Sequence, residues 1–71
     1  MNEMNDLAKA FGNNLRLMRK SKSISQDKLA LLADIDRSYI GRIERGEVNI
    51  TLEKAYQLAR VLGCDVIDLL P

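Results

Sequence analysis

The chain has 71 residues, of which 46% are hydrophobic and 30% are charged, and its formal net charge is +1 at pH 7. This length suits a single domain spanning residues 1–71 with one modest core, and the composition excludes both a disordered chain and a membrane protein, because no apolar run approaches the roughly 20 residues of a membrane helix. The polar first residues also lack the apolar stretch of a secretory signal, so we expect a cytoplasmic protein.

The apolar residues recur at spacings of three and four, which predicts an all-α fold. The first helix is expected over residues 6–22, after a flexible tail formed by residues 1–5. Its inner stripe consists of Leu7, Phe11, Leu15 and Met18. Basic residues gather near its end, where cations suit the helix dipole.

Two short helices should follow, joined by a tight connection. Ser25 is a good N-cap for a helix over residues 26–33. Asp34 tolerates the left-handed backbone that a tight turn needs, and Asp36 can cap the next helix. That third helix is expected over residues 37–45, and it stops at Gly46.

The last part of the chain predicts two more helices. Thr51 caps a helix over residues 52–62 that Gly63 ends, and Asp65 can cap a short fifth helix. The fifth helix carries more apolar side chains than one short helix can bury. These are Val66, Ile67, Leu69 and Leu70.

Cys64 is the only cysteine, and the chain has no histidine. A zinc site of the usual kind is therefore excluded, and the thiol has no histidine to activate it as a nucleophile. We expect no metal, no cofactor, no small-molecule ligand and no enzymatic activity. Cys64 itself is interpreted as a buried small apolar residue rather than a redox sensor.

Charge is distributed unevenly along the chain. Residues 1–24 contain five basic and two acidic residues, residues 25–46 contain four of each, and residues 47–71 contain two basic and four acidic residues. One end of the domain could therefore face the phosphates of a nucleic acid while the other end serves a different purpose.

Residues 25–46 are the most informative part of the sequence. Two short helices joined by three residues describe a helix-turn-helix unit, the first with small alanines and the second with polar residues on its outer face. On that outer face, Arg37, Ser38, Arg42 and Arg45 offer the donors that read base edges in the major groove. Gly41 would either let the helix approach the groove floor or accommodate helix packing.

Four motifs carry a resemblance over residues 11–70: L-R-x-x-R at 15–19, S-Q-x-x-L-A at 25–30, Y-I-x-x-I-E-R-G at 39–46 and L-x-x-A-x-x-L-A-x-x-L-G at 52–63. Together they resemble the Xre and Cro/repressor family of transcription regulators, which implies a compact five-helix, lambda-repressor-like DNA-binding domain. The run from Asp36 to Gly46 also resembles the controller proteins of restriction-modification systems, although other regulators of the family share it.

The resemblance implies roles for individual residues. Arg37, Ser38 and Arg42 match base-reading positions, whereas Gln26 and Arg45 match positions that contact the DNA backbone. Tyr39 either contacts a phosphate through its hydroxyl group or packs beside the turn.

Two further residues match a structural pair, and three depart from the family pattern. Arg19 and Glu44 match a partly buried salt bridge between the first and third helices. Asp34 replaces the usual glycine of the turn, Ile50 replaces a common proline, and Glu47 is acidic where many relatives are basic.

We expect a homodimer whose interface contains the apolar residues of the fifth helix, Val66, Ile67, Leu69 and Leu70. Such a dimer would present its two third helices to successive major grooves about 34 Å apart.

The sequence therefore predicts a transcription regulator, either a repressor, an autoregulator or a controller protein, that binds an inverted repeat in double-stranded DNA. The alternative is an antitoxin-like or assembly protein that uses the helix-turn-helix for partner binding, which the acidic last third of the chain favours. An enzyme is excluded for want of paired catalytic groups.

Overall fold

The computed structural model describes residues 3–71 and is all-helical, as predicted. It contains α1 (Glu3–Ser21), α2 (Gln26–Ala33), α3 (Arg37–Glu44), α4 (Leu52–Leu62) and the 3-10 turn η1 (Val66–Asp68). The prediction of five helices is wrong in one respect, because the last element is a single 3-10 turn. Within the described residues, no helix is both long enough and apolar enough to cross a bilayer.

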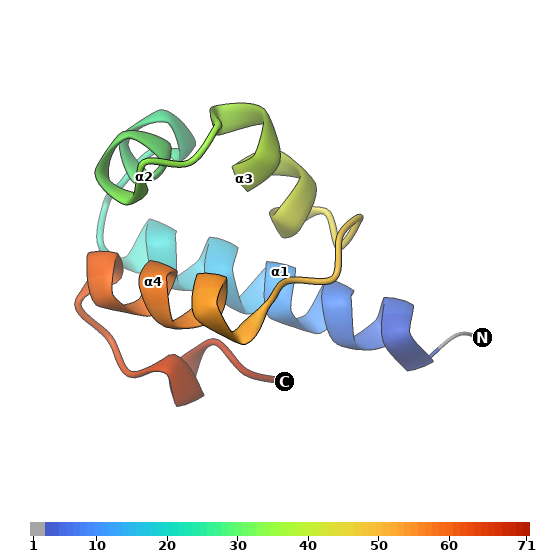
Figure 1. Cartoon of the computed structure of the whole chain (residues 1–71). Helices are drawn as coiled ribbons and strands as arrows, with labels where there is room; N and C mark the ends of the chain where they lie inside the picture. Colours follow the sequence, from blue (N-terminus) through green and yellow to red (C-terminus); the bar gives the residue numbers. More distant parts are fainter. Residues whose placement is uncertain (1–2) are drawn as a thin grey trace.

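The helices form two layers (Figure 1). Helices α2 and α3 lie together on one side of the molecule, and α1 and α4 lie beneath them. Helix α1 contacts α3, and α2 contacts both α3 and α4. The η1 turn contacts α4 on the side away from α2 and α3. The helix-turn-helix and the C-terminal turn therefore occupy different faces.

One hydrophobic core joins the four helices. Phe11 and Leu15 of α1 are buried in it, and Met18 packs against it. Leu7 departs from the expected stripe, because 53% of its surface is exposed. The core also contains Leu29, Ala30, Ala33, Ile40, Ile43, Ala55, Leu58, Ala59, Leu62 and Leu69.

Local signals in the sequence explain most helix ends. The hydroxyl groups of Ser25 and Thr51 accept hydrogen bonds from the backbone N–H groups of Lys28 (3.0 Å) and Lys54 (3.1 Å). Asp36 occupies the N-cap position of α3, but its side chain makes no capping hydrogen bond. Helix α1 begins at Glu3 rather than at residue 6, so part of the expected tail is helical; Met1 and Asn2 lie outside the described residues.

Gly12 allows α1 and α3 to cross closely. A Cβ atom at Gly12 would collide with the carbonyl oxygen of Ile43 and would lie 2.8 Å from that of Glu44. Both obstacles are backbone atoms, which cannot move aside as a flexible side chain can. The α1–α3 distance thus depends on a residue without a side chain.

We expect Gly12→Ala to lower the free energy of unfolding by about 1–3 kcal/mol, because the added methyl group must push α3 away from α1. Urea denaturation followed by circular dichroism measures this change. The neighbouring Asn13→Ala replaces an exposed side chain and should change the value by less than about 0.5 kcal/mol. Equal stability of Gly12→Ala and the unaltered chain would contradict the close crossing.

Candidate nucleic-acid interface

Helices α2 and α3 are joined by the three residues 34–36 and contact each other directly. Asp34 takes the left-handed conformation (φ 55°, ψ 46°) expected from the sequence. The next backbone N–H, that of Ile35, donates to the carbonyl oxygen of Ala30 over 3.0 Å. This arrangement ends α2 abruptly and lets α3 start in a new direction, which is the geometry of a helix-turn-helix unit.

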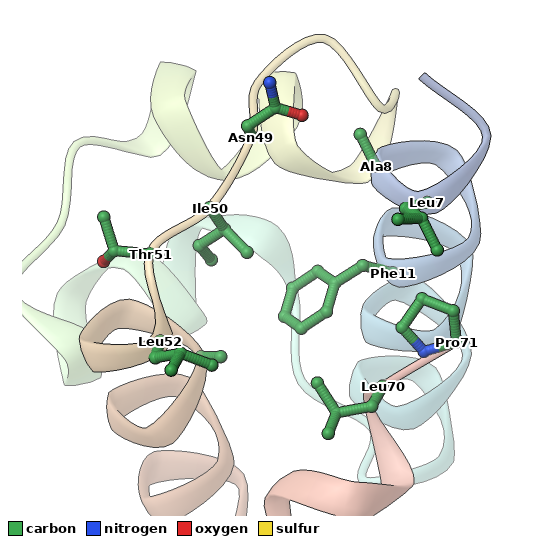
Figure 2. A pocket seen from close by; sticks show the side chains of 10 residues that line it. Leu7, Ala8, Phe11, Asn49, Ile50, Thr51, Leu52, Leu70 and Pro71 are labelled. Atoms are coloured by element: carbon green, nitrogen blue, oxygen red, sulfur yellow. The ribbon is translucent and has the colours of Figure 1, made fainter. Parts of the chain in front are cut away.

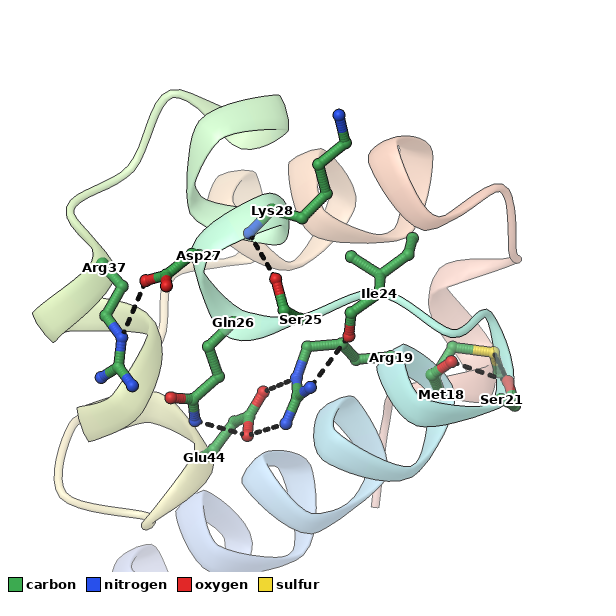
Figure 3. A network of polar contacts seen from close by, with 10 residues as sticks. All are labelled: Met18, Arg19, Ser21, Ile24, Ser25, Gln26, Asp27, Lys28, Arg37 and Glu44. Carbon is green, nitrogen blue, oxygen red and sulfur yellow. Dashed lines mark hydrogen bonds and ion pairs between the residues drawn. The ribbon is translucent and has the colours of Figure 1, made fainter.

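A buried ion pair connects this unit to α1 (Figure 3). The guanidinium group of Arg19 donates to the Glu44 carboxylate through Nε (2.7 Å) and Nη2 (3.0 Å). The exposed fractions of the two side chains are 10% and 3%. Nη1 of Arg19 donates to the carbonyl oxygen of Ile24 over 2.9 Å. The hydrogen bond to Glu44 raises the pKa of Arg19, which favours the charged guanidinium group.

Gln26, the expected phosphate contact, takes part in the same network. Its amide Nε2 donates to Oε1 of Glu44 over 3.0 Å. An amide nitrogen carries two hydrogens, so one N–H remains for another acceptor. Gln26 thus fixes the start of α2 against α3 and can still donate outward.

The four expected DNA-contacting residues of α3 and its C-cap, Arg37, Ser38, Arg42 and Arg45, are all exposed. Arg42 makes no hydrogen bond or ion pair with the residues that the structure describes. Tyr39 is half-buried and packs against the core, which favours the packing interpretation of this residue.

Two arginines of this face pair with carboxylates that the sequence analysis did not assign to the site. Nε of Arg37 lies 3.1 Å from Oδ1 of Asp27, and Nε of Arg45 lies 2.7 Å from Oε2 of Glu47. The second pair raises the pKa of Arg45 and lowers that of Glu47 through their hydrogen bond. Asp27 could not be found by local spacing, because it lies on another helix, whereas Glu47 is only two residues from Arg45.

Gly41 lies between two of these arginines, Arg37 and Arg45, and is buried. A Cβ atom at this position would meet only the ends of the Arg45 and Arg37 side chains, and no atom of another helix. Of the two explanations considered for Gly41, helix packing is therefore wrong. The glycine instead makes room for the two arginine side chains that cover it.

The residues expected at a dimer interface lie in different environments. Leu69 is fully buried in the core of its own chain, so its side chain is not available to a second copy, and that part of the prediction is wrong. Val66 is half-buried against the core, whereas Ile67 and Leu70 are exposed (71% and 39%). Asn14 holds this end of the chain on α1, since its Nδ2 donates to the carbonyl oxygens of Leu69 (3.2 Å) and Leu70 (3.1 Å).

An apolar hollow lies beside this C-terminal end (Figure 2). Side chains from α1, from the loop before α4, from the start of α4 and from the chain end surround it. Leu52 and Leu70 reach it from opposite sides, and the Phe11 ring extends toward it from α1. Apolar surface is thus exposed around the start of α4 and the end of the chain.

Cys64 is half-buried and packs against the core, so it is less enclosed than expected. Burial raises the pKa of its thiol, and the nearby Asp68 carboxylate acts in the same direction. A thiol with a raised pKa forms little thiolate at neutral pH, which is the opposite of what a redox sensor needs.

The fold and this exposed face define the class of the protein as a small helix-turn-helix domain. Residues 15–69 match the family HTH_3, described as helix-turn-helix, and the chain belongs to that family. The resemblance found in the sequence motifs is thereby confirmed at the level of the family.

Relatives and solved structures agree with this assignment. The chain is 42% identical to the control protein C.BamHI of Bacillus amyloliquefaciens over 93% of this chain and 83% of the relative. It superposes on the restriction-modification controller protein C.AhdI of Aeromonas hydrophila with a TM-score of 0.85 and 40% identity, covering 89% of this chain and 96% of that one. The hypothetical transcription factor NHTF from Neisseria gives a TM-score of 0.88 with 34% identity, over 100% of this chain and 82% of the other.

We expect Glu44→Gln to cost about 3–5 kcal/mol of stability, because it leaves the Arg19 charge buried without a counter-charge. Glu47→Gln is the matched control, since it removes the same charge from an exposed pair and should cost far less stability. Urea denaturation of both variants measures the difference. Similar losses in the two variants would show that the buried pair has no special structural role.

Proposed function

We propose that this chain is a DNA-binding transcription regulator that inserts α3 into the major groove of its operator. The observation that carries the proposal is the exposed row of Arg37, Ser38 and Arg42 on a helix that a buried ion pair holds in place. Arginine grips the O6 and N7 atoms of guanine with two parallel bonds, and a rigid helix keeps such a fork in register. The match to a helix-turn-helix family supports this function and not an enzymatic one.

The relatives suggest which kind of regulator this is. C.BamHI is named a control protein, and C.AhdI is described as a restriction-modification controller protein. Because the chain covers most of both proteins, the similarity includes nearly everything that they contain. We therefore assign this chain the role of a controller-type regulator that acts through DNA and without a cofactor.

The residues divide into two groups by their environment. Ser38 and Arg42 read base edges together with Arg37. Arg42 has no partner among the described residues. Gln26 offers its remaining amide N–H to a phosphate, and Arg45 contributes positive charge beside it. Phosphate contacts position the domain, and base contacts supply the sequence preference.

Selection from a random duplex library, followed by sequencing of the retained DNA, tests this function. We expect enrichment of an inverted repeat whose half-sites lie about 10 bp apart. Arg42→Ala should lower the preference at one base pair of each half-site by about 1–3 kcal/mol. Arg16→Ala, which removes an exposed arginine of α1, should leave the preferred sequence unchanged. Retention without any sequence preference would overturn the proposal.

A homodimer forms, in this proposal, through the face that α4 shares with the η1 turn. Tyr56 and Ile67 line one shallow hollow of this face and are 56% and 71% exposed. Leu52 and Leu70 line the hollow of Figure 2 and are also exposed. These four side chains offer more apolar surface to a second copy than the η1 turn does alone.

We expect Ile67→Lys to weaken the dimer by at least about tenfold, because a charged side chain would be buried in an apolar interface. Leu31→Lys is the matched control: Leu31 is similarly exposed (73%) but lies on α2. Sedimentation equilibrium at several concentrations measures the dissociation constants. A dimer that survives Ile67→Lys and dissociates in Leu31→Lys would move the interface to α2.

A further inference from the structure

Arg37, Gly41 and Arg45 form a stripe along the outer surface of α3, each four residues from the next. A Cβ atom built on Gly41 would lie 3.0 Å from Nη1 of Arg45 and 3.5 Å from Nη1 of Arg37. Both guanidinium groups therefore reach within 3.5 Å of one point on the helix surface. The glycine is buried beneath the two guanidinium groups, so its missing side chain is what lets them converge over this point.

Each of these guanidinium groups is also bound by a carboxylate. Asp27 accepts from Nε of Arg37 over 3.1 Å, and Glu47 accepts from Nε (2.7 Å) and Nη2 (3.4 Å) of Arg45. In both arginines Nη1 makes no hydrogen bond to the described residues. Each carboxylate thus binds one side of its guanidinium group. Nη1, which lies over Gly41, keeps its N–H groups available to another acceptor.

This arrangement suits a neutral acceptor better than a charged one. A carboxylate at 2.7 or 3.1 Å cancels much of the charge of its arginine but leaves the remaining N–H groups as directed donors. A phosphate is attracted mainly by net charge and would be repelled by Asp27 and Glu47. A base edge is neutral, and directed hydrogen bonds recognise it.

We propose that Asp27 and Glu47 are specificity-determining positioning residues, which aim Arg37 and Arg45 at one guanine of each half-site, in front of Gly41. This inference rests on the proposed function and deepens it. It also gives Arg45 a base-reading role in addition to its expected contact with the DNA backbone. The guanine offers O6 and N7 as acceptors, one for each arginine.

The test repeats the library selection with Glu47→Gln and Asp27→Asn, each of which keeps the size of the side chain and removes its charge. We expect both variants to lose preference for guanine at the same position of the half-site, by about fivefold or more. Their affinity for random DNA should rise severalfold with a steeper salt dependence, because the freed arginines can bind any phosphate. Circular dichroism spectra and Tm measurements serve to check that both variants are folded.

Two further variants separate positioning from charge. Glu47→Asp keeps the charge but shortens the side chain, so guanine preference should fall while affinity for random DNA stays unchanged. Asp6→Asn removes the same charge from an exposed position of α1, outside α2, α3 and the η1 turn, and should change neither quantity.

The outcomes distinguish this inference from the function on which it rests. Uniform changes over all base positions would assign the two arginines to phosphates and overturn the inference. Loss of preference at two different positions would overturn the convergence on Gly41. An unaltered chain that enriches no sequence would overturn the proposed function itself.

Discussion

The buried ion pair between Arg19 and Glu44 holds α3, the helix proposed to read DNA, in its orientation against α1. One carboxylate of α3 receives hydrogen bonds from α1 and from the first residue of α2, and Arg19 also binds the connection between those helices. Desolvation of two charges offsets most of their attraction, so we attribute to the pair a role in geometry more than in net stability. Among the described residues, no buried side-chain nitrogen or oxygen lacks a hydrogen-bond partner, so the network is complete.

Two helical glycines, Gly12 of α1 and Gly41 of α3, make room for different kinds of neighbour. Gly12 permits close contact on the inner side, where the carbonyl oxygens of Ile43 and Glu44 press against α1. Gly41 makes room on the other side for the ends of the Arg37 and Arg45 side chains, which cover it. Glycine within a helix costs roughly 1 kcal/mol relative to alanine. The first cost is offset by close packing of the core, whereas the second is accompanied by the convergence of the Arg37 and Arg45 guanidinium groups.

The sequence predicted the features that depend on local patterns and missed those that depend on distant contacts. The bounds of α2 and α4 and the left-handed Asp34 follow from caps and turn residues close in sequence. The fifth helix was overestimated because Asp65 and the apolar residues after it resemble a helix start, although only a 3-10 turn forms. Burial of Leu69 and the pairing of Asp27 with Arg37 could not be predicted, since each depends on how separate elements meet in space.

The near-neutral charge of this domain is consistent with a surface that reads DNA by directed hydrogen bonds. A domain that bound mainly through phosphates would gain from every unpaired cation, and its preference for one sequence would be correspondingly weak. Three arginines lie on the outer face of α3 or at its C-cap. Arg37 and Arg45 pair with carboxylates, whereas Arg42 has no partner among the described residues. Exposed pairs of this kind add little stability. In the proposed function, they limit attraction to random DNA and keep the arginine side chains aligned for base edges.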